Sequence, residues 1–199
     1  MLEYEKKILL SQAEYSALLT AMCKDSPACI QTNYYFDTDD FSMNEKGVTC
    51  RIRCKNGKFK TTVKSHGGKE TDCSVENCAN IKNKFDADTF KEMGLHLQGS
   101  LFTERTVAYK DEFCEAVLDS NTYLGNTDYE LEIEYSQEYN EYADNLLFKI
   151  AGILLTEGCI TNIKEFCDRA QNPKSKSQRF FERKKTILSK GNGYNEIYI

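Results

Sequence analysis

The sequence predicts an α+β fold in which an antiparallel sheet, able to close into a barrel, carries helices at its edges. About eight segments alternate apolar and polar residues, as half-buried strands do. Asn56-Gly57 stands between two of these segments as a hairpin turn. In the last third of the chain the apolar residues instead recur at helical spacing. These observations favour a strand-rich body followed by helices.

The first half of the chain is predicted to consist mainly of strands. Residues 2–9 alternate like a strand, and Ser11 with Glu14 forms a capping box that opens a helix through about Lys24. The next strands are rich in aromatic and β-branched residues or alternate apolar with polar ones, and they cover residues 30–38, 48–55, 58–64 and 70–75. Short helices are expected between residues 77 and 93.

The second half is predicted to pass from strands to helices. The expected strands cover residues 101–110, 112–119 and 128–135. Gly125 marks the turn before the last of them. A helix over residues 139–155 stops at Gly158, and a second, basic helix covers residues 176–188. This second helix would either close the molecule at one end or move as a lid.

Length and composition predict one domain over residues 1–199. A chain of 199 residues, of which 40% are hydrophobic and 29% charged, is typical of a globular protein with one sizeable core. The longest apolar run, Ile150 to Leu155, is too short to cross a bilayer, so no membrane association is expected. Because Glu3 and Glu5 stand where a secretory signal needs a basic patch, we expect a cytoplasmic protein.

Charge and cysteine usage narrow the classes of function. A net charge of −5 argues against general nucleic-acid binding through phosphate contacts. The nine cysteines are odd in number and contain no CxxC pair, so reduced thiols are expected rather than a disulfide framework or a thiolate metal site. With only two histidines, a histidine-based triad or zinc site is disfavoured. The sequence does not indicate the oligomeric state.

Four of the predicted strands carry one charged face each. Residues two apart on a strand share a face, so the alternation reveals what each face is made of. The acidic faces hold Glu3 and Glu5 together with Lys7 on the first strand, and Glu130, Glu132 and Glu134 near residue 130. The basic faces, on the two strands of the central hairpin, hold Arg51 and Arg53, and Lys60 and Lys64.

A charged strand face has two interpretations. For a single strand the commoner one is a wet side of a half-buried strand. Three glutamates in one row repel each other, however, and glutamate is disfavoured in strands, so a cation is expected beside them. Mg²⁺ takes oxygen ligands, so carboxylates from two strands would hold it beside a phosphate chain. Arginines and lysines on neighbouring strands would then bind the phosphate oxygens.

Several short motifs stand in a fixed order along the chain. They are Glu3-Tyr4-Glu5-Lys6-Lys7, Gln31 to Thr38, Arg51-Ile52-Arg53, Thr62-Val63-Lys64, Arg105, Asp119, Glu130 to Glu134, and Ser175 to Phe181. In this order they resemble the CYTH superfamily, whose members include triphosphatases and a class of adenylate cyclases. The first motif resembles the family's opening Glu-x-Glu-x-Lys, and the resemblance covers nearly the whole chain.

The resemblance implies a closed antiparallel eight-stranded tunnel, with the charged strand faces turned inward and helices packed outside. It assigns Mg²⁺ or Mn²⁺ to the carboxylates of Glu3, Glu5, Glu130, Glu132 and Glu134, with Asp119 as a weaker addition. It assigns the triphosphate to Lys7, Arg51, Arg53, Lys64, Arg105 and Lys176, joined by Arg179. Where many members carry an arginine and alternating glutamates, this chain has Lys69, Glu70, Asp72 and Glu76, whose role the sequence does not assign.

The resemblance predicts metal-dependent cleavage of inorganic tripolyphosphate or a nucleoside triphosphate. Positioning and charge neutralisation suffice for phosphoryl transfer, so no covalent nucleophile is needed. The alternatives are a class IV-type adenylate cyclase, a thiamine triphosphatase that docks the thiamine ring on Tyr34 and Tyr35, and a non-catalytic polyphosphate or nucleotide sensor. Core packing is the commoner role for such tyrosines. Glu5→Gln or Glu132→Gln is expected to abolish activity without unfolding the chain, because each removes a repelling carboxylate.

Overall fold

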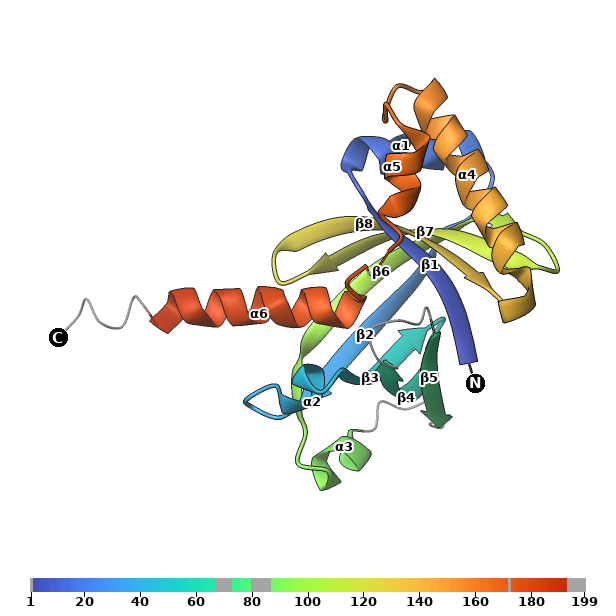
Figure 1. Ribbon diagram of the computed structural model, residues 1–199. Coiled ribbons are helices and arrows are strands. Elements are labelled where there is room, and N and C mark those ends of the chain that lie inside the picture. The colour runs from blue at the N-terminus through green and yellow to red at the C-terminus, as the bar shows by residue number, and fades with distance from the viewer. Residues whose placement is uncertain (1, 67–72, 80–86, 172, 193–199) are drawn as a thin grey trace.

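The computed structural model describes residues 2–66, 73–79, 87–171 and 173–192, and for residues 2, 3, 66, 73–79, 191 and 192 it describes the backbone alone. Its strands are β1 (Leu2–Leu10), β2 (Cys29–Asp37), β3 (Val48–Lys55), β4 (Lys58–His66), β5 (Cys73–Ala79), β6 (His96–Lys110), β7 (Cys114–Tyr123) and β8 (Asn126–Tyr135). Its helices are α1 (Gln12–Met22), α2 (Ser42–Glu45), α3 (Asp88–Glu92), α4 (Asn140–Thr156), α5 (Ile163–Asp168) and α6 (Lys176–Asn192), with a 3₁₀ turn over Gln137–Tyr139 (Figure 1).

The strands form one antiparallel sheet with helices outside it, which confirms the predicted α+β class. Hydrogen-bonded ladders link the strands in the order β1-β5-β4-β3-β2-β6-β7-β8. β1 pairs with β8 along residues 4–10, and it pairs with β5 only through residues 2–4. In the described part of the chain, the seam between β1 and β5 is therefore the shortest of the ladders.

Local sequence signals explain most element boundaries. Ser11 Oγ accepts a hydrogen bond from the Glu14 amide at 3.2 Å, and a Glu14 carboxylate oxygen accepts one from the Ser11 amide at 2.6 Å, which confirms the capping box of α1. Asn56 and Gly57 have φ values of 51° and 71°, as the tight β3-β4 hairpin requires. The predicted strands that lie within the described residues, the helix over residues 139–155 and the basic C-terminal helix are found. Of the short helices predicted between residues 77 and 93, the described residues contain α3, while residues 77–79 belong to β5.

Some boundaries differ from the prediction for identifiable reasons. β7 begins at Cys114 rather than at residue 112, because an Asp111 carboxylate oxygen accepts hydrogen bonds at 2.9 Å from the Phe113 and Cys114 amides and so forms a turn. β6 begins at His96 rather than 101 and passes through Gly99, which interrupts the alternation. The predicted strand at residues 70–75 lies partly outside the described residues, and β5 starts at Cys73. The short helices α2 and α5 were not predicted.

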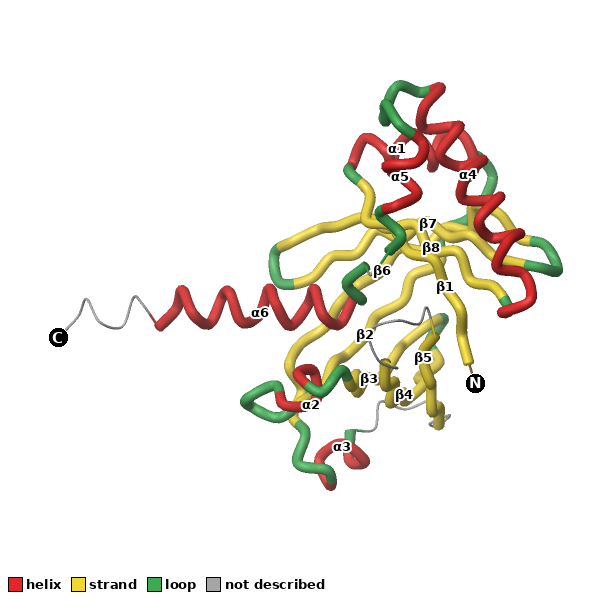
Figure 2. Tube along the Cα trace, in the orientation of Figure 1, coloured by secondary structure: helices red, strands yellow, loops and turns green. Residues whose placement is uncertain are grey.

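Two groups of helices pack on different parts of the sheet (Figure 2). The larger apolar core lies between α1, α4 and α5 and the outer faces of β1, β7 and β8, with Ile8, Leu18, Leu131, Ile133 and Ile150 almost fully buried. A smaller core holds α3 against β2 and β3 through Phe36, Ile52 and Phe90. The alternate residues on the same strands are the charged ones, so packing of the apolar face determines where the charged face points.

Helix α6 starts against the sheet and projects away from it (Figure 1). Its first turns are anchored by Phe180 and Phe181, which pack with Tyr35, Leu101 and other buried residues. Gly99 lies directly under Phe180, and a Cβ atom at Gly99 would come within 2.9 Å of the phenylalanine ring. A side chain at this position would therefore force the Phe180 ring, which anchors α6, to move. Within the described residues, no helix is long and apolar enough to cross a membrane.

Candidate active site

A cavity of about 280 Å³ lies inside the sheet and is lined mainly by charged side chains. Nine of the sequence-predicted site residues line it: Glu5, Lys7, Arg51, Arg53, Lys64, Arg105, Glu132, Glu134 and Lys176. They come from β1, β3, β4, β6, β8 and the start of α6. The fold thus brings together residues that are up to 171 positions apart, from Glu5 to Lys176.

The other predicted site residues fall into two groups. Asp119, Glu130 and Arg179 are buried beside the cavity and do not line it. The Glu3 side chain lies outside the described residues. So do Lys69, Glu70, Asp72 and the side chain of Glu76, to which the sequence assigned no role.

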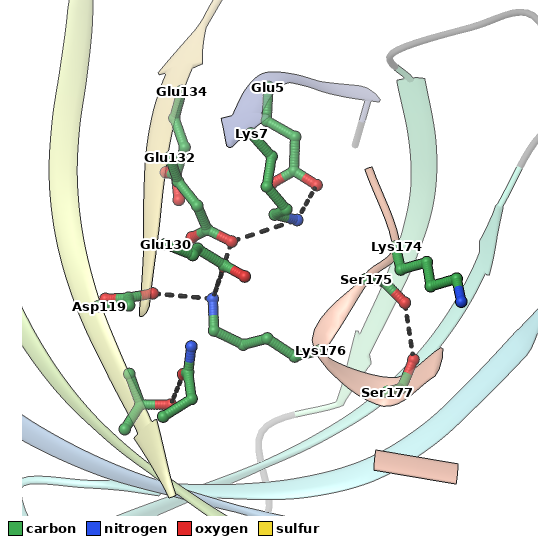
Figure 3. Close-up of polar contacts among 12 residues, drawn as sticks. Glu5, Lys7, Asp119, Glu130, Glu132, Glu134, Lys174, Ser175, Lys176 and Ser177 are labelled. Carbon is green, nitrogen blue, oxygen red and sulfur yellow. Dashed lines mark hydrogen bonds and ion pairs between the residues drawn. The ribbon is translucent and has the colours of Figure 1, made fainter. Parts of the chain in front are cut away.

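The acidic side of the cavity, formed by β1, β7 and β8, contains its own cations (Figure 3). Strand pairing places Lys7 opposite Glu132, and Lys7 Nζ lies 3.2 Å from a Glu132 carboxylate oxygen and 3.0 Å from one of Glu5. Burial lowers the pKa of Lys7, but Glu132 and Glu5 outweigh burial, so the pKa of Lys7 is raised. Lys7 is therefore a fixed cation between two carboxylates.

Lys176 reaches from the first turn of α6 into a cluster of three carboxylates (Figure 3). One carboxylate oxygen from each of Asp119, Glu130 and Glu132 lies within 4.8 Å of the other two. Lys176 Nζ is 2.8 Å from Asp119, 2.8 Å from Glu132, and also bonded to Glu130. Although burial raises the pKa of Glu132, Lys176, Lys7 and Arg105 hold it well below the ordinary value. We call Asp119, Glu130 and Glu132 the acidic trio.

Two arginines complete the neutralisation of this side. Arg105 on β6 lies opposite Asp119 on β7 and donates two hydrogen bonds to its carboxylate, at 2.8 and 2.7 Å. It also contacts Glu132, and its Nη1 lies 3.4 Å from Glu134. Arg179, one turn along α6 from Lys176, pairs with Glu130 and Asp128. Bidentate pairing of this kind fixes a guanidinium in both position and orientation.

Arg53 on the basic side of the cavity is in a different situation. Strand pairing places it opposite Asn33, and Arg53 Nε donates a hydrogen bond of 2.9 Å to the Asn33 side-chain oxygen. Among the described residues no carboxylate pairs with Arg53. Burial, together with the nearby charges of Arg51 and Arg105, lowers the pKa of Arg53 to about 10. Its positive charge is therefore poorly compensated within the described part of the protein.

The cavity also contains residues that the sequence did not mark as site residues. They are Tyr35, Thr49, Lys55, Lys60, Glu115, Ser175 and Ser177. The alternation of β4 placed Lys60 on the basic face, so that signal was available. Tyr35 was ambiguous because its ring is in the core while its hydroxyl faces the polar side. Ser175 and Ser177 lie inside the C-terminal motif, which gave a role only to Lys176 and Arg179, and Thr49 lies in none of the motifs.

A second hollow, of about 750 Å³, lies outside the sheet between α1, the segment after it, and β6 to β8. Its lining includes Tyr15, Ser16, Tyr129 and Glu104, with Lys24 as the one cation among the described lining residues. It offers neither grouped carboxylates nor grouped cations. The smaller inner cavity is thus the candidate active site.

An antiparallel sheet whose inner side brings carboxylates and cations around one cavity defines a class of proteins with a charged interior. The comparison with protein families identifies the particular family. The chain belongs to the CYTH domain family, whose sequence profile matches residues 1–157.

Individual relatives agree with this family. YjbK of Bacillus subtilis, named as a proposed triphosphatase, is 29% identical over 147 residues, which cover 67% of this chain and 77% of the relative. A crystal structure from Bacillus halodurans, described as a proposed adenylate cyclase, is 25% identical with a TM-score of 0.61 and covers 90% of this chain and 97% of its own. A Hippeastrum protein, described as a proposed adenylyl cyclase that reveals a dominant triphosphatase activity, has a TM-score of 0.64 at 20% identity; the match covers 91% of this chain and 95% of the Hippeastrum chain.

Proposed function

We propose that the protein is a divalent-metal-dependent triphosphatase that cleaves a phosphoanhydride bond of inorganic tripolyphosphate or a nucleoside triphosphate in the inner cavity. The relative from Bacillus subtilis, named as a proposed triphosphatase, supports this class of activity. The observation that carries the proposal is the contrast between the two sides of the cavity. On one side of the cavity, carboxylates are paired with lysine and arginine side chains of the protein. On the other side lie arginines and lysines, and the cavity between the two sides has a volume of about 280 Å³.

Arg53 supplies the physical argument for an anionic substrate. A buried guanidinium beside other cations is unfavourable unless an anion compensates it. Arg53 has an amide oxygen as its hydrogen-bond acceptor and no carboxylate partner among the described residues. Phosphate oxygens offer several acceptors and the geometry that guanidinium groups prefer. We therefore assign phosphate binding to Arg53, together with Arg51, Lys64, Lys7 and Arg105.

The carboxylates that line the cavity have the chemistry of a site for Mg²⁺ or Mn²⁺. Glu5, Glu132 and Glu134 offer oxygen ligands, which these hard cations prefer, and Glu3 extends the same strand face. The acidic trio has suitable ligands too, but the Lys176 ammonium lies among all three members, whereas Glu5 and Glu134 line the cavity with side chains that are 27% and 48% exposed. We therefore assign the metal to the cavity-lining carboxylates. When bound, it would neutralise phosphate charge and make water a better nucleophile.

The protein side chains act mainly by binding and charge stabilisation. Water attacks the terminal phosphorus, the bridging P–O bond breaks, and phosphate leaves pyrophosphate or a nucleoside diphosphate behind, with one proton released. The basic side chains hold the non-bridging oxygens, whose charge is redistributed in the transition state. Arg105 and Lys7 keep Glu132 and Glu5 ionised and in place. No covalent nucleophile is needed.

Two structural expectations form part of this proposal. The ring of strand pairings would form a closed tunnel around the substrate, sealed where β1 meets β5. Residues 1–199 would form one working domain although the family profile ends at residue 157, because Lys176 and Arg179 pair with carboxylates of β8.

An adenylate cyclase is the second candidate, favoured by the description of the Bacillus halodurans structure. One set of reactions separates the candidates. The purified protein is incubated with Mg²⁺ or Mn²⁺ and with tripolyphosphate, ATP or thiamine triphosphate, and phosphate, pyrophosphate and cyclic AMP are measured, with EDTA as control. We expect phosphate release that EDTA stops. Cyclic AMP from ATP would establish the cyclase instead, and binding of these compounds without any product would indicate a sensor.

A further inference from the structure

The first turn of α6 forms one wall of the cavity. Ser175, Lys176 and Ser177 all line it. Ser175 caps the helix, because its Oγ accepts from the Gln178 amide at 3.3 Å while the Gln178 side-chain oxygen accepts from the Ser175 amide at 2.7 Å. The amides of Lys176 and Ser177 belong to the first turn and have no intrahelical acceptor in an α-helix, and both residues line the cavity. A helix N-terminus of this kind attracts anions.

The hydroxyl of Tyr35 is a second, independent feature of the same wall. Tyr35 lines the cavity, is only 1% exposed, and its hydroxyl has no hydrogen-bond partner among the described residues. Its ring is fixed by Phe180, whose centroid lies 4.9 Å away, so the hydroxyl cannot swing out to water. Native proteins rarely leave a buried hydroxyl without a partner. A ligand in the cavity would supply that partner.

The surroundings of this hydroxyl favour an acceptor that carries negative charge. Burial raises the pKa of Tyr35, while the nearby cations Arg51, Lys176 and Arg53 oppose that rise, so the hydroxyl remains a donor. Thr49 Oγ1 lies 2.7 Å from Ser177 Oγ, which is 3.1 Å from Ser175 Oγ. A chain of hydroxyls can turn its last proton toward a ligand oxygen.

We propose that the Tyr35 hydroxyl, Ser177 and the N-terminal amides of α6 form a subsite that binds the free terminal phosphoryl group of the substrate. This inference rests on the proposed function and adds a specificity to it. A free terminal phosphoryl group has three oxygens without a carbon substituent, so it matches several donors that converge from different elements. An esterified end offers fewer acceptors and more bulk. The subsite therefore selects triphosphates with at least one unesterified end.

The subsite also depends on the docking of α6. Tyr35 packs on Phe180 and Phe181, and Lys176 is held by the acidic trio. Tyr35, which donates a hydrogen bond in the subsite, thus also packs against the phenylalanines that hold α6 on the sheet. Binding of the terminal phosphoryl group would hold α6 against the sheet.

The test uses Tyr35→Phe, which removes the hydroxyl and keeps the ring. Binding of tripolyphosphate is measured by calorimetry in EDTA, so that metal-dependent turnover does not enter. We expect the dissociation constant to rise about tenfold, equal to about 1.4 kcal/mol. The melting temperature of the free variant should stay level or rise, because the lost hydroxyl had no partner. Ser177→Ala should weaken binding by a smaller factor.

Tyr109→Phe is the matched control, because its hydroxyl bonds Asp111 at 2.7 Å and lies away from the cavity. It should lower the melting temperature and leave binding unchanged. A third arm uses diadenosine triphosphate, in which both ends are esterified, and its binding should not respond to Tyr35→Phe.

Three results would overturn the subsite: wild-type affinity for tripolyphosphate in Tyr35→Phe, an equal loss for diadenosine triphosphate, or a fall in melting temperature like that of Tyr109→Phe. Failure of the proposed function would look different. In that case the wild-type protein itself would neither bind tripolyphosphate in EDTA nor hydrolyse it with Mg²⁺ or Mn²⁺. If wild-type binding and hydrolysis are intact while Tyr35→Phe is unchanged, only the subsite is wrong.

Discussion

The two sides of the cavity differ in how their charges are compensated. On the acidic side, Glu132 contacts three cations, Lys7, Arg105 and Lys176. On the basic side, the one hydrogen-bond acceptor of the Arg53 side chain among the described residues is the neutral side chain of Asn33. Within the described residues, the acidic side is thus largely neutralised by side chains of the protein, whereas Arg53 has no carboxylate partner and can pair with a bound anion. The difference teaches that a buried charge without an ion-pair partner indicates a ligand more clearly than the number of charged residues in the cavity.

The largest expected effect is that of Glu132→Gln. We expect loss of metal-dependent activity and a decrease of about 3–5 kcal/mol in the free energy of unfolding, because three buried or half-buried cations lose a shared partner. The sequence alone predicted that the fold would tolerate this change, but the ion pairs of Glu132 argue for a substantial cost. Chemical denaturation and phosphate release measure the two effects.

Glu5→Gln is the comparison for Glu132→Gln on the same side. Glu5 pairs with Lys7 alone among the described residues and is partly exposed, so its neutralisation should change stability by less than about 1 kcal/mol. We expect it to abolish metal-dependent activity. Equal destabilisation by the two substitutions would show that the number of cation partners does not determine the cost.

Arg53→Gln tests the basic side. We expect activity to fall by about 10²–10³, the typical cost of removing one donor to transition-state charge. Stability should be unchanged or higher, because Arg53 is repelled by Arg51 and Arg105. Lys91→Gln, which breaks an exposed ion pair with Asp88, serves as the control and should have wild-type activity. A clear loss of stability in Arg53→Gln would contradict the contrast between the two sides.

Lys176→Gln removes the ammonium that contacts all three members of the acidic trio, and so tests whether the trio can bind a metal ion. Without metal we expect a loss of about 2 kcal/mol. The loss should be less than that of Glu132→Gln because Glu130, whose pKa burial raises to about 7, can take up a proton. Mg²⁺ should then raise the melting temperature of the variant more than that of the wild type, since the one ammonium that contacts all three members of the trio has been removed. Thermal unfolding with and without MgCl₂ would show this, and equal shifts would exclude the trio as a latent metal site.

The smallest effect concerns an ion pair outside the cavity. Glu14 on α1 bonds Arg169, with Nη1 at 2.6 Å. Burial raises the pKa of Glu14, but hydrogen bonds from Arg169 and Ser11 outweigh it, so the pKa lies below the ordinary value of 4.5. Ionised Glu14 therefore stabilises the fold above pH 4.5, and this contribution disappears as the pH falls through the lowered pKa. Glu14→Gln should cost about 1 kcal/mol at pH 7 and less in acid, measured by denaturation at several pH values.

The sequence predicted most of the fold because its signals are local. The Asn56-Gly57 turn and the Ser11 cap depend on a few adjacent residues, and the alternation of β1, β3, β4 and β8 separates an apolar from a charged face. Short helices such as α5 have too few residues to show a period. The start of β7 depended on the hydrogen bonds of Asp111, which composition does not reveal.

The site residues could be predicted from the sequence where charged residues alternate along a strand. Contacts between residues that lie far apart in the sequence could not be predicted. The cavity-lining charged residues followed from alternation and family resemblance. The pairing of Lys176 with the acidic trio joins residues up to 57 positions apart, from Asp119 to Lys176, and only the fold brings them into contact. The Tyr35 hydroxyl could not be distinguished from an ordinary core tyrosine, because whether it has a partner is a property of three-dimensional packing.

The position of Lys176 bears on where this protein can be cut. A polypeptide ended at residue 157, the last residue that the family profile matches, would keep every strand yet lose both Lys176 and Arg179. The Glu130 carboxylate would then lose both of the cations that pair with it, Lys176 and Arg179. Such a truncated protein should be less stable than the full chain, so the segment that the family profile matches is shorter than the segment that supplies the partners of Glu130.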